Sequence, residues 1–298
     1  MPIRRVGVVG AGTMGQGIIQ VTAEAGIAVV FQEVNQEAID RALAGISASL
    51  DTEVAKWGIT EKEKALIMSR IGTTTTYEGF NEVDLVIEAV DEDLEKKKSI
   101  YDLLNQICRS NVIYATNTST LSVSNLGFYS GRPDRFIGMH FQPPVPKKPL
   151  VEIVRGLSTS DQTYQLVREF AITLQKTAIE VFEWPGYVTT RVMIPLINEA
   201  VFALMEGVAS AEDIDKAMVL GCGMEMGPLH MADAMGLDTV VFQMEHLFRE
   251  LGDIKYRPCP LLKKMIRAGH LGVKTGKGFF EYELPDSVKV HPHVASVL

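Results

Sequence analysis

Residues 10–15, Gly-Ala-Gly-Thr-Met-Gly, join a short apolar run at 6–9 to a segment at 13–25 that favours a helix. The apolar run is rich in β-branched residues, which suits a buried parallel strand. In this setting Gly10 permits a tight turn, Gly12 lets a pyrophosphate approach the backbone, and Gly15 lets the helix pack closely on the strand. The free N–H groups at the helix N-terminus attract phosphate. The segment therefore predicts a strand–turn–helix unit that binds a dinucleotide.

An acidic residue ends the next strand-like segment, residues 28–33. Glu33 is placed to accept hydrogen bonds from the adenosine ribose hydroxyls, and its charge would repel a 2′-phosphate. Val34 and Asn35, which follow, supply no arginine to bind such a phosphate, so NAD is expected rather than NADP. A turn that binds no ligand is the alternative, and the agreement of strand, helix and acid argues against it. The cofactor-binding residues predicted from this unit are Gly10, Gly12, Thr13, Met14, Gly15 and Glu33.

Strand-like and helical segments alternate over the first two thirds of the chain. Helical patterns occur at 100–107 and 164–174. Such alternation is typical of an α/β protein with a doubly wound, Rossmann-type and mostly parallel sheet. Further strand-like segments recur at 85–88, 112–115, 135–139, 151–154 and 178–182.

Two departures from this alternation divide the chain further. An amphipathic stripe at positions 39, 43, 46 and 50, a break at Gly58 and a charged stretch at 61–64 predict a helical hairpin near 36–70. After Trp184-Pro-Gly186 the alternation stops and long helical patterns follow. We therefore expect an NAD-binding domain at 1–185, which includes the hairpin, and an all-helical domain at 186–298.

Composition argues against several classes of function. The formal net charge of −8, without a dense Lys/Arg run, argues against a nucleic-acid surface. No stretch approaches the roughly 20 apolar residues that span a membrane, and the start leaves no room for a signal peptide. Cys108, Cys222 and Cys259 are far apart, which indicates reduced thiols and a cytoplasmic protein. His291 and His293 form the only close histidine pair and have no cysteine nearby, so no metal site is expected.

His140 is the best candidate for a proton-transferring group. It follows an apolar run and lies at the end of an expected strand, the edge where open parallel sheets bind ligands. Its ordinary pKa range suits proton exchange near neutrality. Glu152 lies twelve residues on, after a Pro-rich hairpin that could bring its carboxylate beside the ring. From spacing alone, a catalytic base and a buried histidine satisfied by a backbone carbonyl are equally open.

Several motifs, in order along the chain, together carry a family resemblance. They are "GAGTMGQG", "VIEAVDEDLEKKK", "ATNTSTLSVSNL", "DRFIGMHF", "PLVEIV", "PGYVTTR", "MGPL" with "GLDTV", and "KTGKGFFEY". The chain resembles the 3-hydroxyacyl-CoA dehydrogenase family, which includes bacterial 3-hydroxybutyryl-CoA dehydrogenases. The resemblance implies a two-domain fold, oxidation of an L-3-hydroxyacyl thioester to the 3-ketoacyl thioester with NAD, and a homodimer formed through the helical domain, which also serves substrate binding.

The resemblance also implies roles for individual residues. His140 matches the family's general base and Glu152 its carboxylate partner. Ser119 matches the serine that hydrogen-bonds near the reacting oxygen and the nicotinamide, and it is expected to contact both substrate and cofactor. The further cofactor contacts that the resemblance implies are Glu92, Lys97, Asn117 and Lys274.

Two residues depart from the family pattern. Pro143 replaces the asparagine of the family's His-Phe-Phe-Asn-Pro, and Thr190 replaces the asparagine of Pro-Gly-Phe-x-x-Asn-Arg. Threonine keeps one hydroxyl donor with a shorter reach. In the hairpin, which the family uses to hold the CoA nucleotide, Lys56 stands beside Trp57 but among several acids. We expect Ser119, Lys56 and Thr190 to contact substrate, and an altered substrate on an unchanged redox core is the hypothesis these departures favour.

Three functions remain open at this stage. The first is an NAD-dependent dehydrogenase of short-chain 3-hydroxyacyl-CoA. The second is a related dehydrogenase, acting either on a hydroxyacyl group held by an acyl carrier protein in secondary metabolism or on a sugar acid. The third, of another class, is a dinucleotide-binding protein without catalysis.

Overall fold

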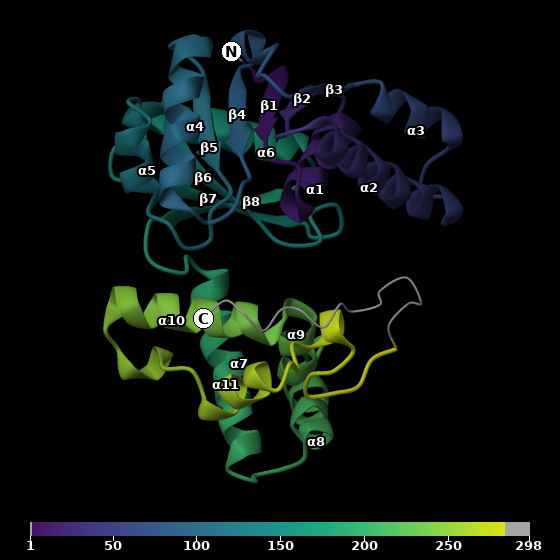
Figure 1. The fold of residues 1–298 in the computed structure, drawn as a ribbon, viewed down its shortest axis with the longest axis vertical. Helices are drawn as coiled ribbons and strands as arrows, with labels where there is room; N and C mark the ends of the chain where they lie inside the picture. Colours follow the sequence, from purple (N-terminus) through teal and green to yellow (C-terminus); the bar gives the residue numbers. More distant parts are fainter. Residues whose placement is uncertain (1, 284–298) are drawn as a thin grey trace. The chain divides into compact units, whose positions relative to one another are not determined.

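The computed structural model describes residues 2–283, and its first unit is built on one sheet (Figure 1). The sheet has the strand order β3-β2-β1-β4-β5-β6-β7-β8. All neighbouring strands pair in parallel except β6 and β7, which are antiparallel. The expected doubly wound, mostly parallel sheet is therefore confirmed. The strands are β1 (Arg5–Val9), β2 (Ala28–Gln32), β3 (Ile71–Thr74), β4 (Leu85–Glu88), β5 (Ile113–Thr116), β6 (Phe136–Phe141), β7 (Leu150–Arg155) and β8 (Thr177–Phe182).

Helices cover both faces of this sheet. They are α1 (Thr13–Glu24), α2 (Gln36–Ala55), α3 (Glu61–Met68), α4 (Leu94–Ile107), α5 (Val123–Tyr129) and α6 (Asp161–Thr173), with short 3₁₀ turns at η1 (Phe80–Glu82) and η2 (Pro133–Arg135). Val8 belongs to a core cluster shared with α1, α2, α3 and α6, whereas Val9 belongs to a cluster shared with α4 and α5. Because neighbouring strand residues point to opposite faces, the continuous apolar runs of β1 and β4 fill both layers.

The segment that follows the α2–α3 hairpin forms a strand that the sequence pattern did not predict. β3 has only four residues, Ile71-Gly-Thr-Thr74, and just the last of them is buried. It pairs with β2 at the edge of the sheet. Its stability comes from backbone hydrogen bonds to β2 more than from apolar burial, so no hydrophobic period marks it.

The contacts of the chain divide after Tyr187, close to the expected boundary, and the second unit is helical. Its elements pack around Ile197, Val240, Met244 and Leu262, all fully buried. None of the helices within residues 2–283 is long and apolar enough to cross a membrane. The elements are α7 (Thr189–Met205), α8 (Ala211–Lys216), the π-helical turn η3 (Ala217–Gly221), α9 (Pro228–Met235), α10 (Leu237–Leu251), η4 (Ile254–Tyr256), α11 (Pro260–Arg267) and η5 (Val273–Thr275).

The glycine turn between β1 and α1 is tightly packed against itself. Gly10 adopts a φ of 86°, in the left-handed region that side chains rarely occupy. A Cβ added at Gly15 would lie 2.0 Å from the carbonyl oxygen of Gly10, which is backbone and cannot move aside cheaply. The start of α1 therefore sits directly against the end of β1.

We predict that Gly15→Ala destabilises the first unit by about 1–3 kcal/mol, because the added methyl group overpacks the turn. The measurement is thermal unfolding by calorimetry. Gly221→Ala is the matched control, since a Cβ there meets nothing within 4 Å, and its Tm should not fall. A Gly15→Ala protein with an unchanged Tm would contradict the close packing of Gly15 on the Gly10 carbonyl.

Candidate active site

A cavity of about 470 Å³ lies beside the glycine turn. Its walls come from the ends of β1 and β2, the loop after β4, and α4. Gly10, Gly12 and Glu33 line it, together with Asp91 and Lys96. The volume falls within the range of small-molecule sites, roughly 300–1,000 Å³. The turn predicted to bind a dinucleotide therefore lines a cavity of the size that a small molecule occupies.

The residues around this cavity fit NAD. Gly12 is the N-cap of α1 and no side chain caps that helix, so N–H groups of its first turn, where Thr13 and Met14 lie, stay open to a phosphate. A Cβ at Gly12 would meet nothing within 4 Å, which leaves room for the approach. The Glu33 carboxylate accepts hydrogen bonds from the N–H groups of Ala11 at 2.6 Å and Val34 at 3.1 Å. It is thereby fixed at the cavity wall, where a ribose would need it.

His140 and Glu152 lie directly opposite each other on the antiparallel pair β6 and β7. The Nδ1 atom of His140 is 2.7 Å from Oε2 of Glu152. Glu152 is completely buried and His140 is 7% exposed. The ring of Tyr187 meets the imidazole edge-on, with the two centroids 5.4 Å apart. The structure thus brings together the two residues that the spacing of twelve had linked.

This contact determines what the imidazole can do. With a carboxylate at Nδ1, that nitrogen carries the proton and donates it to Glu152, which leaves the lone pair on Nε2. The negative charge of Glu152 also stabilises the imidazolium that forms when Nε2 takes a proton. The Gln142 side-chain nitrogen lies 3.3 Å from Nδ1. In this tautomer Nε2 is therefore the ring atom that can accept a proton.

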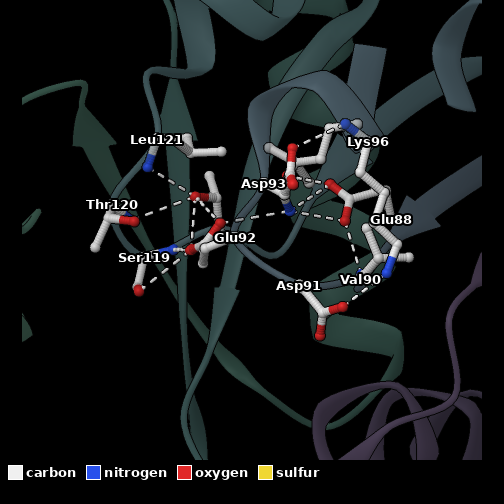
Figure 2. Close-up of polar contacts among 12 residues, drawn as sticks. Glu88, Val90, Asp91, Glu92, Asp93, Lys96, Ser119, Thr120 and Leu121 are labelled. Carbon is white, nitrogen blue, oxygen red and sulfur yellow. Dashed lines mark hydrogen bonds and ion pairs between the residues drawn. The ribbon is translucent and has the colours of Figure 1, made fainter. Parts of the chain in front are cut away.

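Ser119 lies in the loop after β5, where Glu92 holds it. The Glu92 carboxylate accepts hydrogen bonds from the Ser119 N–H at 2.7 Å and from the Thr118 hydroxyl at 2.8 Å, and the Ser119 hydroxyl lies 3.4 Å away. Thr118 in turn accepts a hydrogen bond from the N–H of Leu121 at 2.8 Å. In Figure 2, Glu92 points toward Ser119 and the loop that continues to Leu121. These hydrogen bonds therefore fix the loop that carries Thr118 and Ser119, the serine loop, to the Glu92 carboxylate.

Asn117 ties the end of β5 to its neighbours. Its side-chain oxygen accepts a hydrogen bond from the N–H of Phe141 at 3.0 Å, and its own N–H donates to the carbonyl oxygen of Glu88 at 2.8 Å. Phe141 directly follows His140. Asn117 thus fixes the serine loop relative to the strand that carries the imidazole.

Lys97 is buried, with 1% of its side chain exposed. Its ammonium lies 2.7 and 2.8 Å from the two carboxylate oxygens of Glu88 and 3.5 Å from Glu92. Glu88 was absent from the site predicted by sequence. The signal that could have identified it is an acid at the end of an apolar, fully buried strand, since such a charge requires a partner.

The remaining predicted site residues lie elsewhere in the chain. Thr190 is in the first turn of α7, and the Lys274 ammonium lies 2.6 Å from both oxygens of Asp238. Lys56 ends α2 beside Trp57, whose side chain is 96% exposed. These positions do not test the expected roles. The substrate contacts of Lys56 and Thr190 and the cofactor contact of Lys274 stay predictions.

Within residues 2–283, no cluster of three or more His, Cys, Asp or Glu residues is arranged to hold a metal ion. The pair His291 and His293 lies outside the described residues.

Comparisons with known proteins cover nearly the whole chain. The models of the 3-hydroxyacyl-CoA dehydrogenase NAD binding domain and C-terminal domain match residues 5–184 and 186–282. A 3-hydroxybutyryl-CoA dehydrogenase of Clostridioides difficile is 45% identical over 278 residues, which are 93% of this chain and 99% of the relative.

Solved structures agree with these matches. The (S)-3-hydroxybutyryl-CoA dehydrogenase PaaH1 from Ralstonia eutropha is 45% identical, with a TM-score of 0.91, and the match covers 95% of this chain and all of that one. FadB2 of Mycobacterium tuberculosis is 36% identical, with a TM-score of 0.93 and the same coverage.

We predict that Glu33→Ser weakens NADH binding about tenfold and reduces the preference for NADH over NADPH, because the ribose loses its acceptor and a 2′-phosphate loses its repulsion. Fluorescence titration with both nucleotides measures the two effects. Glu37→Gln, an exposed acid on α2, is the control and should bind NADH as the unmodified protein does. An unchanged NADH/NADPH ratio in Glu33→Ser would exclude the assigned role.

Proposed function

We propose a specific substrate and a set of residue roles for this chain, which belongs to the 3-hydroxyacyl-CoA dehydrogenase family. The family resemblance expected from the motifs is thereby confirmed. The chain is an NAD-dependent oxidoreductase acting on a CH–OH group. The proposed reaction interconverts a short-chain 3-hydroxyacyl-CoA, such as 3-hydroxybutyryl-CoA, and the corresponding 3-oxoacyl-CoA.

The observation that carries this proposal is the buried pair of His140 and Glu152, 2.7 Å apart. The parallel strands β1, β4, β5 and β6 all end at one edge of the sheet, so His140 lies at the same edge as the glycine turn. A protein that only binds a dinucleotide has no use for a buried base and a carboxylate at this edge. The pair therefore favours catalysis over a purely binding role.

The proposed roles follow from the geometry. When bound, NAD would supply the acceptor for the hydride that leaves the carbon carrying the hydroxyl group. His140 takes the hydroxyl proton at Nε2, and the Glu152 carboxylate balances the charge that then develops on the ring. Ser119, held by Glu92, donates its hydroxyl to the reacting oxygen. In the opposite direction the imidazolium returns the proton.

The acyl group has three candidate carriers. CoA is favoured by the relatives named 3-hydroxybutyryl-CoA dehydrogenases. Against it, Lys64 of the hairpin is engaged by Asp51 at 2.5 Å, which leaves less positive charge for a nucleotide phosphate. Pro143 and Thr190 add to this difference on the substrate side. An acyl carrier protein is therefore the second candidate carrier, and a free hydroxy acid the third.

We also propose that the protein is a cytoplasmic homodimer formed through its helical unit. The support is a set of large apolar side chains exposed on α7 and α10, among them Val192, Phe242 and Phe248. Exposed apolar patches of this kind mark surfaces that associate with a partner.

We predict that His140→Gln lowers turnover of acetoacetyl-CoA at least about 100-fold, because the proton-transferring nitrogen is lost, while NADH affinity stays within a factor of about two. The NADH absorbance assay and fluorescence titration measure these quantities. His230→Gln is a matched control: His230 also lies 2.6 Å from a carboxylate, Asp215, but in the second unit, and its turnover should be retained. Equal losses in both variants would argue against the assignment.

We predict that Thr190→Asn raises kcat/KM for acetoacetyl-CoA several-fold, because an amide reaches further than a hydroxyl as a donor. The assay compares acetoacetyl-CoA, acetoacetyl groups loaded on acyl carrier protein, and free acetoacetate with NADH. A loss of CoA activity in Thr190→Asn, together with a preference of the unmodified protein for the carrier-loaded substrate, would support the second carrier instead.

A further inference from the structure

Lys97 occupies an electrostatically unfavourable position. It is the fourth residue of α4, close to the helix N-terminus, where the helix dipole repels cations. Its side chain is also almost completely buried, which removes the hydration of the ammonium. Two carboxylates compensate for both costs, Glu88 at 2.7 Å and Glu92 at 3.5 Å. A charge that costs this much to bury calls for an explanation beyond packing.

Glu88 is a fixed anchor for this ammonium. Its two oxygens accept hydrogen bonds from Lys97, from the N–H of Val90 at 2.8 Å, from the hydroxyl of Thr116 at 2.7 Å and from Tyr101 at 3.3 Å. Burial, together with the charge of Glu88, holds the pKa of Tyr101 well above its usual value, so its hydroxyl stays a donor. Glu88 therefore cannot follow Lys97 if the ammonium moves.

Glu92 is different, because a quarter of its side chain is exposed. It faces Lys97 on one side and the serine loop on the other, where it accepts hydrogen bonds from the Thr118 hydroxyl and the Ser119 N–H. Figure 2 shows Glu88 toward Val90 and Glu92 toward Ser119. Without the cation, water would compete for the Glu92 carboxylate, and the Ser119 N–H would lose its fixed partner.

We propose that Lys97 is a positioning residue for Ser119 that acts through Glu92, and not a direct contact of the dinucleotide. The chain of contacts runs from the buried anchor Glu88 through the ammonium to Glu92 and then to the serine loop. The proposal rests on the proposed function, in which the Ser119 hydroxyl meets the reacting oxygen. The buried ion pair thus contributes to catalysis by restricting where that hydroxyl points.

A double-mutant cycle tests this proposal. Lys97→Met alone would leave Glu88 buried without its counter-charge and would risk unfolding. The first variant is therefore Glu88→Gln with Lys97→Met, which removes both charges at once. Glu92→Gln is a second, independent route, because it leaves the Glu88–Lys97 pair in place. Each is made with and without Ser119→Ala, and Lys98→Met, a half-buried neighbour paired with Glu95, is the control.

The measurements are kcat and KM for acetoacetyl-CoA, the NADH dissociation constant and Tm, all on the full-length protein. On the unmodified background we expect each change to lower kcat about tenfold, with KM and the NADH dissociation constant within a factor of about two. On the Ser119→Ala background the same changes should lower kcat less than about twofold, because the group they position is gone. Lys98→Met should leave all four quantities unchanged.

Two results would overturn the positioning role. One is an equal loss of kcat on both backgrounds, which would mean that Lys97 acts independently of Ser119. The other is a large rise of the NADH dissociation constant in the Glu88→Gln, Lys97→Met protein, which would mean that Lys97 binds the dinucleotide. An unmodified protein that does not turn over acetoacetyl-CoA would instead contradict the proposed function, and is thereby distinguished from both.

Discussion

The hydrogen bond between Nδ1 of His140 and the Glu152 carboxylate depends on one antiparallel strand pair. Parallel strands end together, so a parallel β7 would begin at the far edge of the sheet and carry Glu152 away from the ligand edge. Because β7 runs against β6, its third residue returns to that edge and lies opposite His140. The carboxylate can then be completely buried and still have a partner, which a buried charge requires. The reversal of a single strand thus gives His140 its carboxylate partner.

The polar groups on β4 and β5 reach this edge because their strands run parallel to β1. β4 and β5 run parallel to β1, so Glu88 and Asn117 arrive at their carboxyl ends without any reversal. Asn117 then binds the backbone of both neighbours, at Glu88 and Phe141. The imidazole on β6 and the serine loop after β5 are therefore held in one frame of backbone hydrogen bonds. Catalytic geometry needs such support, because small displacements of reacting groups are costly in rate.

Much of this arrangement could be predicted from local signals. The apolar run, the three glycines and Glu33 indicated the dinucleotide turn, and the short hairpin after His140 indicated its partner. Lys97 was harder, because it stands in a run of three lysines, Lys96–Lys98. Only its helical phase with Tyr101 and Leu104, both fully buried, places it on the inward face. β3 gave no signal at all, since backbone pairing with β2 stabilises it and such pairing leaves no pattern of apolar residues.

The two departures from the family pattern, Pro143 and Thr190, lie at positions where no buried charge depends on the side chain. Pro143 is exposed, and Thr190 carries a neutral hydroxyl. Replacing either residue costs at most a hydrogen bond. In contrast, Glu88 and Lys97 are bound to each other in the interior, as His140 is to Glu152, so changing one member alone would strand a charge and cost several times more. The fold can therefore accept single substitutions at Pro143 and Thr190, whereas a change in either buried pair costs least when both members change together.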